Sequence, residues 1–310
     1  MGLLLDFFLV ILVLMAGWWT IGAKDGCSAA VAFVTYGLVL ALIWIRIAAP
    51  DVALTEAAIG SGLTGGMLIA ASTRLESARR PARPGPATRR LGIVLSALLA
   101  AALAWAVLSL PYPPPSLAKA AITALPPTGL GNPITGVLLS FRAVDTLLEK
   151  VVLILALLGT WSLAPDRLWG GVPGRKQPRH ADSPLTLLAQ ILPPIGFVIG
   201  WHILWVGANE PGGAFQGGTI LAAMWMLAVM AGLVDVPATS RLWLRLLVIV
   251  GPGLFLIVGF AGFAFAGGFL AYPAGFAKPL ILVIEIVLTV SIAAILLLLL
   301  AGPPERQPPA

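Results

Sequence analysis

Residues 209–218, NEPGGAFQGG, interrupt two long apolar segments and determine how the rest of the chain is read. Pro211 lacks a backbone N–H and fixes φ, and the paired glycines allow backbone shapes that other residues rarely adopt. This run therefore cannot continue a helix. Because an apolar segment lies on each side, we expect the chain to leave a membrane here and re-enter it, with a carboxylate and an amide at the break. An ordinary tight turn is the plain alternative.

The composition indicates a membrane protein that crosses the bilayer many times. Of the 310 residues, 59% are hydrophobic and only 10% are charged, whereas a soluble domain carries roughly 25% charged residues. The net charge of +6 does not indicate nucleic acid, because the basic residues lie in short loops between apolar runs, where they orient a membrane protein. The predicted fold class is all-α, a polytopic membrane helix bundle.

Cysteine and histidine are too scarce to suggest a cofactor. A single cysteine, Cys27, excludes an internal disulfide, and the two histidines, His180 and His202, lie far apart in the sequence. We therefore expect no haem, iron–sulfur cluster or metal site built by this chain alone. The first apolar run has no basic start and no small-residue cleavage site, so we interpret it as a retained helix.

Nine segments are apolar and long enough to be membrane-spanning helices, which need about 20 residues each. These candidates are residues 2–21, 27–48, 52–72, 91–110, 146–164, 185–206, 216–234, 242–267 and 277–301. Segment 111–145 is too rich in proline to span, and we expect it to lie over the outer surface or against a partner.

Two basic loops predict the orientation of the bundle. Loop 73–90 contains six arginines against one glutamate, and loop 165–184 is also basic. Both are expected on the cytoplasmic side. The count of spans then places the N-terminus and the 209–218 break outside and the C-terminus inside, with Arg46 as a mild exception.

Glu56 is the first candidate for ion chemistry. Pro50 and Asp51 start a helix, and Glu56 follows about one and a half turns inside the apolar run. A charged and unpaired carboxylate at that depth costs several kcal/mol, so it must be protonated, paired or in contact with water. The alternative is an acid at a helix end near the headgroups.

A second charged cluster surrounds the start of the fifth span. Asp145 and Glu149 are four residues apart and share a helix face, and Arg142 and Lys150 can pair with them. The cluster is a candidate relay, or alternatively an interfacial anchor for a helix end.

Glu285 is an isolated acid in the last apolar run, which makes it a functional candidate by default. Lys278 lies two turns earlier on the same face but too far along the helix for direct contact. His202 lies about one and a half turns before the break. A helix-pairing role for Glu285 is the alternative.

Residues 211–218 resemble the PGGGFQGG signature of the B subunit of Mrp (Mnh) multisubunit cation/proton antiporters. This chain has Ala214 in place of the third glycine, and Gly207-Ala208 where the family more often has Gly-His. The wider structural motif at the break consists of Asn209, Glu210, Pro211, Gly212, Gly213, Phe215, Gln216, Gly217 and Gly218. The resemblance implies a four-helix module over residues 184–302.

Two further motifs resemble neighbouring modules of the same family. Residues 49–57, APDVALTEA, closely resemble the signature of the MbhD-like domain, and residues 141–149 resemble the FR-x-x-DT-x-x-E pattern of the MbhE-like domain. The implied organisation is a three-helix MbhD-like module at 1–75, a two-helix MbhE-like module at 76–166, a basic linker at 167–183, the MnhB-like module at 184–302 and a disordered tail at 303–310.

The resemblance implies a non-enzymatic membrane subunit of a multisubunit Na⁺/H⁺ antiporter-like complex in a bacterial cytoplasmic membrane. Large antiporter-like subunits and small Mrp-type subunits are the implied partners, besides membrane lipid. Candidates for the ion or proton path are Glu56, ranked first, then Glu149 and Asp145, then Glu285, with Asp51, Lys150, Arg142, Lys278 and His202. A membrane-arm subunit of a redox-driven ion pump and a non-conducting assembly scaffold are the alternatives.

Overall fold

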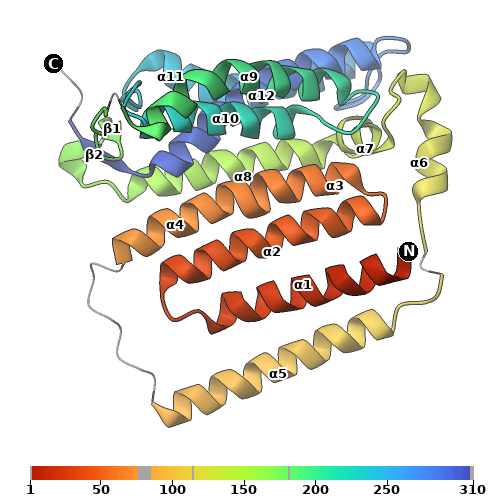
Figure 1. The fold of residues 1–310 in the computed structure, drawn as a ribbon. Coiled ribbons are helices and arrows are strands. Elements are labelled where there is room, and N and C mark those ends of the chain that lie inside the picture. Colours follow the sequence, from red (N-terminus) through yellow and green to blue (C-terminus); the bar gives the residue numbers. More distant parts are fainter. Residues whose placement is uncertain (1, 76–84, 114, 181, 308–310) are drawn as a thin grey trace.

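The computed structural model describes residues 2–75, 85–113, 115–180 and 182–307. Its long helices run side by side along one common direction (Figure 1). The prediction of an all-α, polytopic membrane fold is confirmed, since within the described part of the chain only two short strands accompany the helices.

The N-terminal part is a layer of helices. It contains α1 (Gly2–Gly22), α2 (Gly26–Arg46), and a third span made of α3 (Pro50–Thr55), the π-helical segment η1 (Glu56–Leu63) and α4 (Thr64–Leu75). Asp25 caps α2 by accepting a hydrogen bond from the Ser28 N–H at 2.7 Å. Helix α5 (Pro86–Leu108) lies beyond α1 (Figure 1), and none of its residues is buried.

A broken connection follows α5. It contains α6 (Ala118–Ala124), the 3₁₀ turn η2 (Pro126–Thr128), α7 (Pro133–Gly136) and the π-helical turn η3 (Val137–Phe141). None of these pieces is long enough to span a bilayer. Among the described residues, the proline-rich segment therefore forms no spanning helix before α8, and its place on the outer surface stays a prediction.

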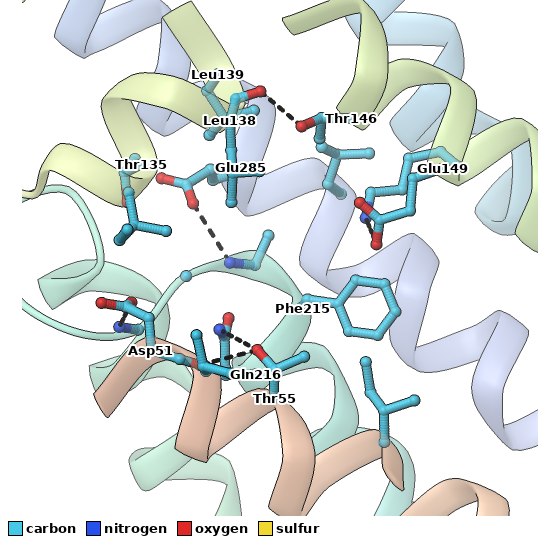
Figure 2. A pocket seen from close by; sticks show the side chains of 18 residues that line it. Asp51, Thr55, Thr135, Leu138, Leu139, Thr146, Glu149, Phe215, Gln216 and Glu285 are labelled. Atoms are coloured by element: carbon cyan, nitrogen blue, oxygen red, sulfur yellow. Dashed lines mark hydrogen bonds and ion pairs between the residues drawn. The ribbon is translucent and has the colours of Figure 1, made fainter. Parts of the chain in front are cut away.

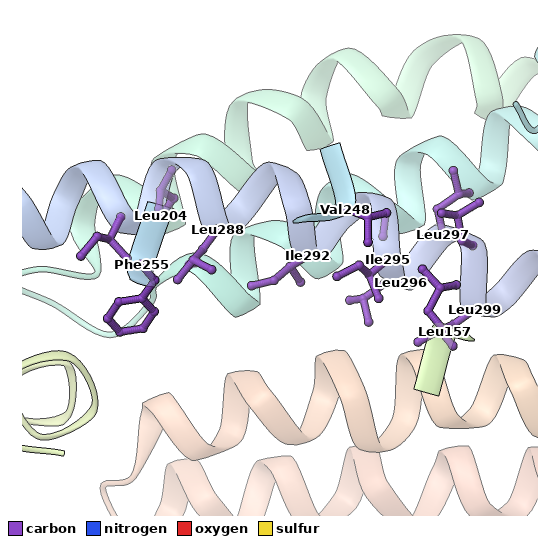
Figure 3. Packing of buried hydrophobic residues seen from close by; sticks show 14 of the residues in the cluster. Leu157, Leu204, Val248, Phe255, Leu288, Ile292, Ile295, Leu296, Leu297 and Leu299 are labelled. Carbon is purple, nitrogen blue, oxygen red and sulfur yellow. The ribbon is translucent and has the colours of Figure 1, made fainter. Parts of the chain in front are cut away.

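The C-terminal half is built around one central helix. Helix α8 (Ala143–Ser162) leads through η4 (Asp166–Leu168) and β1 (Val172–Pro173) to α9 (Pro184–Val206), α10 (Ala214–Met230), α11 (Leu242–Phe265), α12 (Ala277–Ala301) and β2 (Pro304–Arg306). Helix α12 contacts α8, α9, α10 and α11, and its residues from Ile292 to Leu299 are all buried. Figure 3 shows its apolar side chains packed with Leu157, Leu204, Val248 and Phe255.

Helices occupy all nine positions predicted as spans. Among the described residues, seven of them are long and apolar enough to cross a membrane. Helix α10 is shorter, with 17 residues, and α8 has 20 residues but carries three charged side chains, Asp145, Glu149 and Lys150. The fold therefore places charge within α8, one of the helices that contact the central helix α12.

The two ends of the bundle differ. The end of α4, the start of α5 and the β1–β2 pair lie at one end, and the start of α1, α6, α7 and the 209–213 break lie at the other (Figure 1). This arrangement matches the alternation of spans expected from the basic loops. Loop residues 76–84 are outside the described residues, and the assignment of the cytoplasmic side stays a prediction.

The prediction of a disordered tail is wrong for residues 304–306. These residues form β2, which pairs antiparallel with β1. The Arg306 guanidinium also donates to both carboxylate oxygens of Asp235, at 2.6 and 2.8 Å, and this pair holds the pKa of Asp235 below its usual value. Strand pairing and a bidentate ion pair thus order residues 304–306, in a tail too rich in proline to continue the helix. Residues 308–310 lie outside the described residues.

Candidate functional site

The 209–218 break folds into a tight return that glycine makes possible. Gly212 and Gly213 have φ of +152° and +132°, which other residues rarely adopt. A Cβ on Gly207 would lie 2.5 Å from the backbone nitrogen of Gly213, so the two arms of the break touch through backbone atoms. The Gly213 N–H donates to the Ile203 carbonyl at 3.1 Å. The break thereby brings the start of α10 directly against the end of α9.

Asp51 ties the break to two other parts of the chain. Its Oδ1 atom accepts hydrogen bonds from the Gly212 N–H at 3.1 Å and from the Asn132 side chain at 3.3 Å. The buried Asn132 amide also donates to the Glu210 carbonyl at 3.0 Å. Three segments that are distant in sequence therefore meet at one carboxylate.

Two more hydrogen bonds strengthen this junction. Gln216 donates to the Thr55 hydroxyl at 3.1 Å, and the buried Thr135 hydroxyl donates to the Gly207 carbonyl at 2.6 Å. Sequence reasoning missed Asn132 and Thr135. The pair Asn132-Pro133 was the available signal, because asparagine followed by proline is typical of a helix N-terminus, and Asn132 does cap α7.

Glu285 lies at the centre of the site. Its side chain projects from α12 and is 3% exposed, and its Oε1 atom accepts a hydrogen bond from the Ala214 N–H at 3.3 Å. Ala214 is the first residue of α10, so the carboxylate occupies the positive end of that helix dipole. The second oxygen, Oε2, is buried without a hydrogen-bond partner among the described residues. Figure 2 shows the Glu285 carboxylate next to Thr135 and the start of α10.

Lys150 is a buried cation in the same site. Its side chain is 4% exposed, its Nζ atom is 3.2 Å from Glu149 Oε1, and it lies 4.3 Å from the centroid of the Phe215 ring. Glu149 is half exposed, with 46% of its side chain accessible. The ammonium is therefore held by one carboxylate and one aromatic face, a combination that is favourable when the cation is removed from water.

These side chains line one cavity of about 340 Å³. Its polar lining comes from α3, α7, α8, α10 and α12, and Figure 2 shows how these elements surround it. The polar lining residues are Asp51, Thr55, Thr135, Thr146, Glu149, Lys150, Gln216 and Glu285. A space of this size with several polar partners can hold water or a small hydrated ion.

The structure separates Glu56 from this cavity. Glu56 is not among the lining residues, and its carboxylate lies against Gly60 and against Gly37 of α2. The nearby Ser61 hydroxyl is buried without a hydrogen-bond partner among the described residues. Glu56 thus belongs to the interface between α2 and η1, and its role as a relay stays a prediction.

The other predicted residues are distributed around the site. Arg142 and Asp145 form an exposed ion pair at 2.5 Å, Lys278 donates to the Asn209 side chain at 2.8 Å, and His202 is exposed on α9. None of these residues lines the cavity.

Tyr272, in the loop before α12, donates a hydrogen bond to the Leu139 carbonyl at 2.9 Å. Burial raises the pKa of its hydroxyl, so the hydroxyl stays protonated and remains a donor.

No metal centre is formed by the described part of the chain, where no three His, Cys, Asp or Glu side chains gather at ligand distance. The charged groups of the site are instead one buried acid, one buried base and two acids that are partly accessible. Such a set can hold and release protons or a monovalent cation without a redox group.

Comparison with protein families identifies two modules. Residues 11–77 match the MbhD family of MBH subunits, and residues 184–302 match the domain related to the MnhB subunit of Na⁺/H⁺ antiporter. An uncharacterised protein of Methanocaldococcus jannaschii is 30% identical in an alignment 164 residues long, which covers 44% of this chain and 58% of the relative.

Two solved structures share the fold. The match to a chain in the structure of the Mrp complex from Dietzia sp. DQ12-45-1b covers 98% of this chain and 35% of that chain, with a TM-score of 0.77 and 22% identity. The membrane-bound sulfane sulfur reductase, an archaeal respiratory membrane complex, matches 69% of this chain and 98% of its own chain, with a TM-score of 0.55 and 22% identity. The chain therefore joins a region that matches the MbhD family, residues 11–77, to a region that matches the MnhB-related domain, residues 184–302, in a fold shared with these two membrane complexes.

Proposed function

We propose that this chain is a membrane subunit of an Mrp-type antiporter complex that exchanges a monovalent cation such as Na⁺ for protons. The observation that carries the proposal is the Glu285 carboxylate, buried in a polar cavity with one oxygen lacking a partner among the described residues. A buried acid with an unsatisfied oxygen is costly inside a membrane protein, and this cost favours a functional role for Glu285. The family matches of the two modules support the same conclusion.

The geometry allows Glu285 to exist in two charge states. When it is ionised, the N-terminus of α10 and the Lys150 ammonium in the same cavity balance the negative charge. When Oε2 carries a proton, Lys150 retains Glu149 and the Phe215 ring as partners. A cation that enters the cavity competes with the proton for Glu285, and this competition is the basis of exchange.

The chain acts together with larger subunits in this proposal. The Mrp complex structure extends well beyond the matched part, since the chain spans 35% of the matched chain there. We propose large antiporter-like subunits and small Mrp-type subunits as partners, in a bacterial cytoplasmic membrane. Residues 76–166 would act as an MbhE-like module that contributes Lys150 and Glu149 to the shared cavity.

The test is sodium-driven proton flux in inverted membrane vesicles that contain the assembled complex. Glu285→Gln keeps an oxygen that can accept from Ala214 but cannot ionise, so we expect flux to fall to the level of vesicles without the chain. Lys150→Met should have the same effect. Asp145→Asn, in the exposed pair with Arg142, is the matched control and should retain flux.

Assembly must be measured beside flux, by the amount of partner subunits that co-purify with the chain. If Glu285→Gln weakened assembly but left flux per assembled complex unchanged, the acid would serve only to join helices. If it retained both, the proposal would be wrong.

A redox-driven ion pump is the second candidate, because the sulfane sulfur reductase that shares the fold is a respiratory membrane complex. In that case, gentle purification from native membranes would bring down subunits that carry iron–sulfur clusters or flavin. Purification of large membrane subunits without such cofactors would favour the antiporter.

A further inference from the structure

The cavity described above is called the Glu285 cavity. A second and larger cavity lies along the same seam, which is the boundary between α10 and the third span, α3–η1–α4. It has a volume of about 820 Å³ and is lined by η1 and α4 on one side and by α10 and the end of α12 on the other. Its lining also includes Pro173, Gly174, Arg175 and Gln177, which lie at the β1 end of the bundle, opposite the 209–218 break. The Arg175 side chain is 84% exposed, so this end of the cavity reaches the protein surface.

The two cavities come close to each other at η1. Ile59 lines the Glu285 cavity and Gly62 lines the second one, and these residues are less than one helical turn apart. Along α10 the corresponding residues, Gln216 and Ala223, are about 10 Å apart at 1.5 Å per residue. The barrier between the cavities is therefore thinnest beside η1.

Helix α12 closes the other side of the space between the two cavities. Helix α12 lines the first cavity at Leu288 and the second at Leu300, and between these positions it is almost entirely buried in the apolar core (Figure 3). Leu63, at the end of η1, also packs on this core. Between these two cavities, the apolar barrier is therefore thinnest between η1 and α10.

We propose that the seam between η1 and α10 is the route by which a proton or a small monovalent cation passes between the two ends of the bundle. The Glu285 cavity is the half that opens toward the break, and the second cavity is the half that opens toward β1. Residues 59–62 form the barrier between them. This route rests on the proposed function for its cargo, but its geometry can be tested without transport.

The test uses single cysteines in a Cys27→Ser background, in the assembled complex, with a charged methanethiosulfonate that cannot cross the membrane. Ala223→Cys probes the second cavity, and the neighbouring Ala222→Cys, at a position that is 1% exposed, is its matched control. Val52→Cys probes the Glu285 cavity, and Ala53→Cys, at a position that is 3% exposed, is the control for that half.

We expect the Ala223→Cys probe to react only when the reagent is added at the side of the β1–β2 pair, and the Val52→Cys probe only from the opposite side. Both controls should remain unlabelled. The proposal is overturned if either probe reacts no faster than its control, or if the two probes react from the same side. Because each half has its own probe and control, failure of one variant to assemble leaves the other decisive.

The same variants separate this route from the proposed function. Modification of the Ala223→Cys probe by the bulky reagent should stop flux in complexes that otherwise transport. Labelling from the two opposite sides together with undiminished flux in Glu285→Gln would retain the route and reject the role of Glu285. Loss of flux in Glu285→Gln with both probes unreactive would do the reverse.

Discussion

Asp51 is expected to act as a structural clamp, although the sequence places it beside the candidate relay acids. In Asp51→Ala, the Gly212 N–H and the Asn132 amide both lose their bond to Oδ1. Hydrogen bonds to a charged group contribute about 1.5–3 kcal/mol each. Asp51 is only half buried and water can replace part of the loss, so we expect a decrease of about 3 kcal/mol in the free energy of unfolding.

The conservative variant Asp51→Asn separates charge from shape. Its side-chain oxygen can still accept from Gly212 and Asn132, so the stability loss should be about 1 kcal/mol, the difference between a charged and a neutral acceptor. Because we attribute a clamping role to Asp51, Asp51→Asn should retain ion-driven proton flux in the assembled complex.

The measurement is unfolding of the purified protein by sodium dodecyl sulfate, followed by tryptophan fluorescence. Asp6→Ala is the matched control, since Asp6 pairs with Arg46 at 2.8 Å but both side chains are more than 40% exposed. An exposed pair of this kind contributes at most about 1 kcal/mol. If Asp51→Ala destabilised no more than Asp6→Ala, the clamp would be refuted. Loss of flux in a stable Asp51→Asn protein would instead make Asp51 an ion carrier.

Two further predictions follow from the break and from the C-terminal strand. Gly207→Ala should reduce the amount of folded protein in the membrane, because its Cβ would lie 2.5 Å from the Gly213 nitrogen, whereas Gly253→Ala, with nothing within 4 Å, should not; equal yields would contradict this close packing. The Asp235–Arg306 pair lowers the pKa of Asp235, so its stabilising effect is present above the carboxyl's unfolded pKa of about 3.9 and is lost as the pH falls through the lower folded value. Limited proteolysis of the tail should therefore accelerate in acid, and in Asp235→Asn the tail should be cleaved quickly at every pH; a tail equally protected in both proteins would exclude the pair as its anchor.

The sequence predicted the long elements well because their signals are local. Apolar runs of about 20 residues located the nine long helical segments of the described chain, and the proline, acid and glycines of the break located the return between α9 and α10. The tail could not be predicted in this way. Its order depends on pairing between residues 304–306 and 172–173 and on the Asp235–Arg306 contact, which are distant in sequence.

The candidate site could likewise be predicted from the sequence only in part. Composition by itself predicted a polytopic helical protein with few charged residues, and the resemblance of its motifs predicted the MbhD-like and MnhB-like modules. Only the tertiary structure decided which charges meet: Glu285 and Lys150 line one cavity with Asp51, while Glu56, the acid ranked first by its depth in a helix, faces α2. The physical reason is that depth along a span can be counted from the sequence, whereas the direction in which a side chain points is set by the π-helical segment η1 and by packing between modules.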